Sequence, residues 1–328
     1  MADLPALLAA CACSVVLTGL VRRGALSRSL LDLPNARSSH TTPTPRGGGL
    51  GLVIAAVSAL VVAAGRPVDP PLLLALAGVL LVSGVGWLDD QRSLGVRARL
   101  LAHLFAAATL LPLALSPSPV PPWLGVFAGV WWVFWSVSAI NVVNFMDGID
   151  GLIGSQALIF GAYLALLGDS GGTARELGLV LSGAATGFLA WNWPPAKIFL
   201  GDVGSGALGL LFVLGGLLIL REGRISLVVA YLPLYPVFLD ATATLARRAI
   251  RGERVTEAHR THLYQRLANG GWGHARVTLL YGGLALAAVP IAILMGRLQT
   301  YAIAAYFLLV PATGLALELR SRAASRAT

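Results

Sequence analysis

Long apolar runs recur along almost the whole chain, and they constrain the fold more than any other feature. Each run extends over roughly 17 to 20 residues, which is enough for a helix to cross a hydrocarbon layer about 30 Å thick. Only 12% of the 328 residues are charged and 56% are hydrophobic, whereas soluble domains are about 25% charged. The runs are too long for the short alternating strands of a membrane barrel. The sequence therefore predicts an all-α, polytopic integral membrane protein.

Eleven membrane-spanning helices are predicted from the apolar windows and the breakers between them. They cover residues 4–21, 50–65, 71–88, 99–115, 123–140, 152–168, 176–191, 204–220, 225–245, 276–296 and 299–317. Neither an internal repeat nor a linker between separate domains is visible in the sequence. Residues 1–328 are therefore predicted to form a single transmembrane domain.

The basic residues divide unequally between the two sets of loops that eleven spans create. One set, with the helix ends beside it, carries 19 of the 24 Lys and Arg residues. Cytoplasmic loops are enriched in these residues, so this set is predicted to face the cytoplasm, with the N-terminus periplasmic and the C-terminus cytoplasmic. Because the net charge of +9 is spread over short loops, it indicates orientation in the lipid bilayer and no nucleic-acid binding.

Two adjacent carboxylates end the third predicted span, in "GWLDDQRSLGVRARL". Asp89 and Asp90 repel one another, which favours a bound cation or one raised pKa, and both suit proton transfer or metal binding. The alternative is a charge cluster at a helix end that the arginines after it neutralise.

A second pair of acids follows the fifth predicted span, in "NVVNFMDGIDGL", where no basic residue is present. If this segment is helical, the spacing of three places Asp147 and Asp150 on one face. The alternative is that Asp150 only caps the next helix. Capping needs one aspartate, so two uncompensated acids near Asn144 indicate a bound cation or hydrogen-bond donors from a ligand.

A glycine-rich segment, "WNWPPAKIFLGDVGSGALG", carries Asp202 just before the eighth predicted span. Glycine-rich backbone that runs into a helix N-terminus offers free N–H groups to a phosphate. The alternative is an ordinary turn with Ser205 as the helix cap. The segment is neither a Walker loop, since the G-K-[ST] ending is absent, nor a dinucleotide-binding fingerprint, since no strand precedes it.

Two histidines and an arginine in "EAHRTHLYQRL" have the spacing of one helical stripe. His259, His262 and Arg266 on one face would suit an oxyanion such as phosphate, and the alternative is a solvated basic helix end. Asp240 lies inside the ninth predicted span. A charged carboxylate there has a high free-energy cost, so a functional role for Asp240 is the default hypothesis. Capture by Arg247 or by water is the alternative there.

Taken in order, these motifs resemble the polyprenyl-phosphate N-acetylhexosamine-1-phosphate transferases, the family that includes the phospho-N-acetylmuramoyl-pentapeptide transferase. The matching segments are "DLPNARSSHTTPTPRGGG", "LDD", "NFMDGIDGL", "FLGDVGSGALG" and "HRTHLYQRL". The resemblance extends over nearly the whole chain. It implies transfer of a sugar 1-phosphate from a UDP-N-acetylhexosamine to undecaprenyl phosphate with release of UMP, at the bacterial inner membrane. Mg²⁺ is the implied cofactor, with Mn²⁺ as a substitute, and a homodimer is left open.

The motif positions also imply roles for particular residues. Catalytic roles fall to Asp89, Asp90, Asp202, His259, His262 and Arg266. Substrate-binding roles fall to Asn144, Asp147, Asp150, Asn192, Phe199 and Arg46. Asp202 and Asp147 would hold the metal, Asp89 would deprotonate or position the lipid phosphate, and Phe199 would stack on uracil.

Two departures from the pentapeptide-transferase pattern favour a different branch of the family. Leu88 replaces a third acid before "DD", and "HRTHLYQRL" lacks three adjacent histidines. Both favour an enzyme that initiates O-antigen or another surface glycan, with the pentapeptide transferase as the alternative. A secondary transporter of a phosphorylated solute is the alternative from another class. Transporter sites lie at the midplane between repeats, whereas the acids here cluster at one face.

Overall fold

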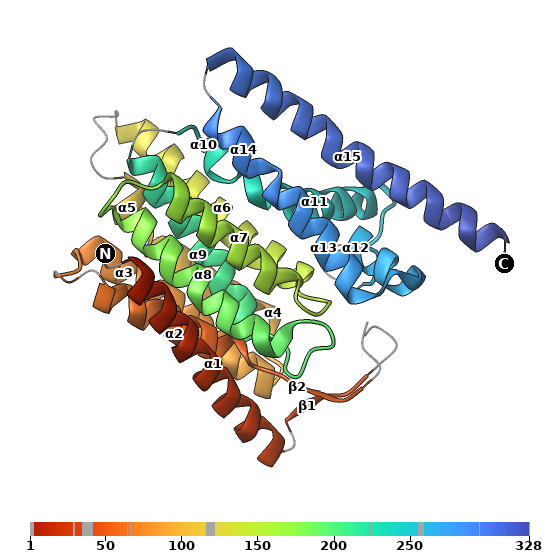
Figure 1. The fold of residues 1–328 in the computed structure, drawn as a ribbon, viewed down its shortest axis with the longest axis horizontal. Helices are drawn as coiled ribbons and strands as arrows, with labels where there is room; N and C mark the ends of the chain where they lie inside the picture. The colour runs from red at the N-terminus through yellow and green to blue at the C-terminus, as the bar shows by residue number, and fades with distance from the viewer. Residues whose placement is uncertain are drawn as a thin grey trace.

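The computed structural model of this chain is a bundle of roughly parallel and antiparallel helices (Figure 1). It describes residues 3–28, 30–34, 42–63, 65, 67–115, 122–222, 225–254, 259–294 and 296–327. The two ends of the chain lie at opposite ends of the bundle (Figure 1). The all-α, polytopic class predicted from the sequence is confirmed.

Helices follow one another along the chain with short connections. They are α1 (Asp3–Ser27), α2 (Gly49–Ala63), α3 (Pro70–Gln91), α4 (Val96–Ala108), α5 (Leu111–Leu115), α6 (Pro122–Met146), α7 (Leu152–Leu167), α8 (Thr173–Asn192), α9 (Asp202–Arg221), α10 (Leu227–Ala230), η1 (Leu232–Leu234), α11 (Tyr235–Ile250), α12 (Leu263–Leu267), η2 (Ala268–Trp272), α13 (Gly273–Leu286), α14 (Ala288–Ile293) and α15 (Gly296–Ala327). Two short antiparallel strands, β1 (Leu31–Asp32) and β2 (Thr44–Pro45), pair in the connection between α1 and α2.

Helical structure covers part or all of each of the eleven predicted spans. Within the described ranges, seven helical segments are long and apolar enough to cross a membrane: Asp3–Ser27, Pro70–Gln91, Val96–Leu115, Leu124–Met146, Asp202–Arg221, Leu263–Ile293 and Leu298–Leu319. Gly49–Ala63 and Leu152–Leu167 are apolar but shorter. The number of eleven crossings, and their orientation, therefore stay predictions.

Helix α9 forms the centre of the bundle. Nearly all of its side chains are buried, on every side of the helix, which is the pattern expected of a helix that is apolar all round. It packs chiefly against α3 and α6, and also against α2, α7 and α8. Its first residue is Asp202, so the position of this carboxylate is determined by the packing of the whole bundle.

The C-terminal end of α3 approaches the beginning of α9 very closely. A Cβ atom added to Gly86 would lie 2.3 Å from the carbonyl oxygen of Asp202, so only glycine fits there. One turn further along α3, the Asp90 carboxylate accepts the backbone N–H groups of Asp202 and Val203 at 3.0 and 3.1 Å. These contacts join two helices that are far apart in sequence.

Two helices extend beyond their predicted ends, and this changes the local setting of several acids. Helix α3 was expected to end at residue 88 but continues to Gln91, so Asp89 and Asp90 belong to its last turn. Helix α6 was expected to end at residue 140 but continues to Met146, which places Asn144 on the helix. The hydrophobic windows end earlier because polar residues occupy the last turns at the bundle end.

The contact between α3 and α9 predicts a specific effect on stability. Gly86→Ala should lower the free energy of unfolding by about 1–3 kcal/mol, because the added methyl group overlaps the Asp202 carbonyl. Gly84→Ala is the matched control, since a Cβ at Gly84 meets nothing within 4 Å. It should leave stability unchanged or raise it by about 0.5–1 kcal/mol. Thermal unfolding of the purified protein in detergent measures both, and equal effects would contradict the proposed packing.

Candidate active site

A polar cavity of about 750 Å³ opens at the end of the bundle where α6 ends and α9 begins. Its lining residues are Asp32, Arg46, Asn144, Asp147, Gly148, Ile149, Asp150, Asn192, Phe199, Leu200, Gly201, Asp202, Gln265 and His274. All six residues predicted to bind substrate are among them, although their roles in binding stay predictions.

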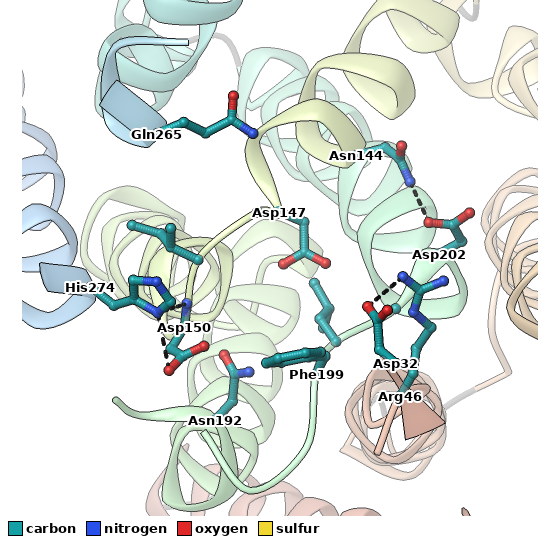
Figure 2. A pocket seen from close by; sticks show the side chains of 14 residues that line it. Asp32, Arg46, Asn144, Asp147, Asp150, Asn192, Phe199, Asp202, Gln265 and His274 are labelled. Carbon is teal, nitrogen blue, oxygen red and sulfur yellow. Dashed lines mark hydrogen bonds and ion pairs between the residues drawn. The ribbon is translucent and has the colours of Figure 1, made fainter. Parts of the chain in front are cut away.

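One side of the polar cavity is built around Phe199 and Asn192. The Phe199 ring is half-buried and lies between Asn192 and Asp147 in Figure 2. The Asn192 carboxamide is buried, accepts the Gly151 N–H at 3.0 Å and donates to the Ile198 carbonyl at 2.9 Å. Asn192 therefore joins the two loops that form this wall, and an exposed aromatic face lies next to it.

Asp150 is held in place by several groups, and it does not cap α7 as one alternative predicted. The residue that caps α7 is Gly151, and residues 147–151 are not helical. The Asp150 carboxylate accepts the Ala196 N–H at 3.0 Å and lies 3.2 Å from Nδ1 of His274. Thr278, one turn beyond His274 on α13, donates to the Asp150 carbonyl at 2.8 Å. The loop at residues 147–151 is thus attached to α13. The second carboxylate oxygen of Asp150 faces the Phe199 side of the cavity (Figure 2).

Asp147 and Asp202 approach the middle of the cavity from different helix ends. Asn144 Nδ2 donates to Asp202 Oδ1 at 2.8 Å and to the Ser205 hydroxyl at 3.0 Å (Figure 2). Burial raises the pKa of the Asp147 carboxyl well above its usual range, and the negative charge of Asp202 adds to this, while Arg46 opposes it. A cation between the two carboxylates would relieve this unfavourable charge.

The donor set fits a magnesium ion only in part. Within the described ranges no group of three or more His, Cys, Asp or Glu side chains is arranged to hold a metal. Mg²⁺, however, usually takes one or two protein carboxylates and completes its octahedron with waters and substrate phosphates. Asp147 and Asp202 supply such a pair, so the residues present are compatible with a metal that binds together with a phosphorylated ligand.

Arg46 brings a positive charge to the rim of the polar cavity. The β1–β2 pairing places it beside Asp32, and its guanidinium lies 2.8 Å from that carboxylate (Figure 2) and 3.7 Å from Asp90. An arginine held by carboxylates at the edge of a polar cavity can bind the oxygens of a phosphate through its remaining N–H groups. This position agrees with the substrate-binding role that the resemblance implied.

The expectation that the glycine-rich start of α9 offers free amides to a phosphate is wrong. The N–H groups of Asp202 and Val203 bind the Asp90 carboxylate, and those of Gly204 and Ser205 bind the Gly201 carbonyl. Ser205 is not the cap either, because the helix begins after Gly201. Because α9 is buried, its first amides need a partner from the protein. The Asp90 carboxylate is that partner, and Asp90 does not line the polar cavity.

A second cavity, here called the inter-helix cavity, lies between α3, α4, α6 and α9. It encloses about 850 Å³ and has a mainly apolar lining with a few polar groups at one end: Asp89, Arg99, His103, Asn141, Asn144 and Asp202. Asp89 accepts the Leu94 N–H at 2.5 Å and an Arg99 N–H at 3.1 Å. Its carboxyl group also lies within hydrogen-bonding range of that of Asp202.

The two cavities share Asn144 and Asp202 in their walls. A polar ligand in the first and a ligand with an apolar chain in the second would therefore meet at this pair of side chains. Asp89 stands on the inter-helix side of the junction and Asp147 on the polar side. The arrangement suits a reaction that joins an amphipathic molecule to a charged one.

His259, His262 and Arg266 do not form the predicted helical stripe. Helix α12 begins only after His262, and His259 lies outside it. His262 is buried against Phe145 and Tyr264, and Arg266 forms an ion pair with Glu318 of α15 at 3.0 Å. Burial lowers the pKa of His262 and lowers that of His259 to about 4, so neither imidazole is positively charged near neutral pH. The three side chains line neither cavity.

Asp240 does not form an ion pair with Arg247, and protein groups take the place of water around its carboxylate. Its buried carboxylate accepts the N–H groups of Leu263 and Tyr264 at 2.8 and 3.0 Å, and the Tyr281 hydroxyl at 2.6 Å. Arg247 instead lies 3.6 Å from Glu318. Asp240 therefore fixes the first turn of α12 against α11 and α13.

Three polar side chains that line the polar cavity, those of Asp32, Gln265 and His274, were not among the predicted site residues. Asp32 lies within the quoted first-loop motif, where its pairing with Arg46 could have drawn attention to it. Gln265 lies inside the "HLYQRL" motif, but the predicted stripe directed attention to its neighbours. His274 is a single histidine outside every motif, and nothing local in the sequence indicates its contact with Asp150.

Comparison with known proteins identifies the family to which this chain is similar. Residues 72–220 match the family described as Glycosyl transferase family 4. A probable undecaprenyl-phosphate N-acetylglucosaminyl 1-phosphate transferase of Bacillus subtilis is 29% identical, with 81% of this chain and 77% of the relative covered. A decaprenyl-phosphate N-acetylglucosaminephosphotransferase of Mycolicibacterium smegmatis is 30% identical, with 80% and 74% covered.

A phospho-N-acetylmuramoyl-pentapeptide-transferase of Symbiobacterium thermophilum is 32% identical, with 87% of this chain and 92% of the relative covered. Similarity at this level over most of both chains extends well beyond the shared motifs. On this similarity and the family match, the chain belongs to glycosyl transferase family 4, as the resemblance of its motifs had predicted.

Proposed function

We propose that this membrane protein transfers an N-acetylhexosamine 1-phosphate from a UDP-sugar to undecaprenyl phosphate and releases UMP. The observation that carries the proposal is the junction of the two cavities at Asn144 and Asp202. The nucleotide would occupy the polar cavity, and the lipid phosphate would reach the junction through the inter-helix cavity. The names of the relatives, which act on undecaprenyl or decaprenyl phosphate and N-acetylglucosamine, support the same reaction class.

In the proposed reaction, an oxygen of the lipid phosphate attacks the β-phosphorus of the UDP-sugar. The bond between that phosphorus and the bridging oxygen breaks, and UMP leaves with both electrons of the bond. The new phosphorus–oxygen bond gives undecaprenyl-diphosphate-linked sugar. Phosphoryl transfer of this kind depends mainly on positioning and on neutralisation of charge.

The residues of the chain would divide these tasks between them. Phe199 would stack on the base, and Arg46 would bind the diphosphate from the rim. Asp147 and Asp202 would hold Mg²⁺, which neutralises phosphate charge and activates the phosphorus when it is bound. Asp89 would receive the lipid phosphate beside Arg99, at the place where that phosphate meets Asp202.

The cellular setting forms part of the proposal. The positive-inside bias supports a multi-pass protein of the bacterial inner membrane with a periplasmic N-terminus and a cytoplasmic active site. Leu88 and the "HLYQRL" motif support an enzyme that initiates O-antigen or another surface glycan. Transfer of phospho-N-acetylmuramoyl-pentapeptide is the second candidate, because the Symbiobacterium relative bears that name.

The reaction itself can be tested with purified protein in detergent or vesicles. With undecaprenyl phosphate, Mg²⁺ and UDP-N-acetylglucosamine, we expect UMP and lipid-linked sugar in equal amounts. UDP-N-acetylfucosamine, UDP-N-acetylquinovosamine and UDP-N-acetylmuramoyl-pentapeptide are assayed in parallel to identify the sugar. The absence of UMP with every one of these donors would show that the proposal is wrong.

If Asp147 and Asp202 hold Mg²⁺, turnover should depend on the metal and on both carboxylates. Removal of divalent cations with a chelator should abolish UMP release, and Mg²⁺ or Mn²⁺ should restore it. Asp202→Asn should lower kcat by about 10²–10³-fold, the usual effect of losing one group that stabilises developing charge. Asp147→Asn should instead raise the Mg²⁺ concentration needed for half-maximal rate. Full activity of either variant at low Mg²⁺ would exclude that residue as a ligand.

Substitution of Asp89 and of Asp90, adjacent on α3, should have different effects on turnover and on stability. Asp89→Asn should lower kcat by about 10²-fold, as for a group that acts on the reacting phosphate, and lower the melting temperature less than Asp90→Asn does, because its partner Arg99 is partly exposed to solvent. Asp90→Asn should also lower the free energy of unfolding by about 1–3 kcal/mol, because the carboxamide has only one oxygen to accept the two amides of α9 that the carboxylate accepts. Equal melting temperatures for the two variants would contradict the capping role of Asp90.

A further inference from the structure

Three consecutive side chains of α12 point in three different directions. Tyr264 is fully buried and its hydroxyl donates to the Phe145 carbonyl at 2.9 Å. Arg266 extends to Glu318 of α15. Gln265, between them, is the one of the three that lines the polar cavity. Figure 2 shows its carboxamide extending from α12 towards the end of α6.

The backbone beneath Gln265 is held firmly. Asp240 binds the N–H groups of Leu263 and Tyr264, and Tyr281 in turn binds Asp240. Tyr264 also packs against the loop at Gly148, where an added Cβ would lie 2.2 Å from the tyrosine oxygen. Binding groups on a backbone fixed in this way keep their geometry with little loss of entropy on binding.

Among the described residues, the carboxamide of Gln265 is hydrogen-bonded through its nitrogen but not through its oxygen. The residue is only 8% exposed, and its Oε1 atom is buried without a hydrogen-bond partner among the described residues. Its amide lies within reach of the Tyr264 hydroxyl, which already donates to Phe145. Buried polar groups are nearly always paired, and an unpaired oxygen on a residue that lines a cavity can accept a hydrogen bond from a ligand there.

The place of Gln265 in the cavity indicates which part of the ligand it meets. In Figure 2, Asp147 lies between Gln265 and Phe199. If the base stacks on Phe199 and the diphosphate lies at Asp147 and Asp202, the sugar extends to the opposite side, towards Gln265. His262 and Arg266, which the resemblance placed in the catalytic site, do not line the cavity.

We infer that Gln265 binds the N-acyl group of the donor sugar and makes the enzyme selective for N-acylated hexosamines over plain hexoses. The inference rests on the proposed function. A carboxamide matches an amide, since its N–H can donate to the acyl carbonyl and its oxygen can accept from the amide N–H. The relatives named above act on N-acetylglucosamine or on N-acetylmuramoyl-pentapeptide, two sugars that share this group.

The test compares two donors in two variants. The ratio of kcat/KM for UDP-N-acetylglucosamine to that for UDP-glucose is measured with undecaprenyl phosphate and Mg²⁺. Gln265→Met keeps the size of the side chain but removes both polar groups. It should lower this ratio about tenfold. The decrease should come from kcat/KM for UDP-N-acetylglucosamine alone, because only this substrate carries the N-acetyl group that the Gln265 carboxamide would bind. The KM for undecaprenyl phosphate should not change.

Gln156→Met is the matched control. Gln156 of α7 is 1% exposed, both atoms of its amide lack a partner among the described residues, and it does not line the polar cavity. This control should leave the donor ratio unchanged even if it changes stability. If Gln265→Met lowers the rates with both donors by the same factor, the residue is structural and the inference is wrong.

Binding separates this inference from the proposed reaction. Calorimetry with Mg²⁺ and each UDP-sugar, without lipid, measures donor selectivity whether or not turnover occurs. A wild-type protein that binds UDP-N-acetylglucosamine more tightly than UDP-glucose, and loses the difference in Gln265→Met, supports the inference. Equal affinity of the wild-type protein for both donors overturns it, while absence of UMP release would overturn the proposed function instead.

Discussion

The Asp90 carboxylate on the first amides of α9 is the contact on which the rest of the site depends. A helix N-terminus leaves N–H groups unpaired and carries a partial positive charge, and α9 is too deeply buried for water to satisfy it. Asp90 does so from α3, and the close approach at Gly86 makes this possible. Successive residues of a helix point in different directions, so Asp89 faces the inter-helix cavity beside Asp202. One capping interaction thereby brings the carboxyl groups of Asp89 and Asp202 together.

The polar cavity is left with an excess of negative charge. Asp147 and Asp202 face its interior, Arg46 is already engaged by Asp32, and burial makes ionisation of Asp147 unfavourable. A cation would relieve this excess, and a diphosphate could bind only together with one. In the proposed reaction the metal and the nucleotide would therefore bind jointly, and the chemistry would take place beside Asn144 and Asp202, which lie in both cavity walls.

Helix α12 shows how a buried carboxylate can position a helix beside the polar cavity without lining that cavity. Asp240 was a functional hypothesis because a charge within a span is costly. Its cost is offset by two backbone amides and a tyrosine hydroxyl, and the result is a short helix held in one orientation. That orientation sends Arg266 to α15 and Gln265 to the cavity. In the inferred binding mode, the motif "HLYQRL" would contact the donor sugar through Gln265, a residue that its charge pattern did not emphasise.

Much of this protein is determined by its sequence alone. Apolar windows determine where helices form, because the cost of burying backbone and charge in lipid is a local property of each segment. Acids and an asparagine near the ends of these windows (Asn144, Asp147, Asp150 and Asp202) line one cavity, and the family resemblance added Arg46, Asn192 and Phe199. Only the tertiary structure decided which groups meet. Asp90 and the amide of Asp202 are 112 positions apart, and the contacts of Asp150 with His274 and of Arg266 with Glu318 also join distant helices. Such pairs depend on how helices pack, and local spacing carries no record of that packing.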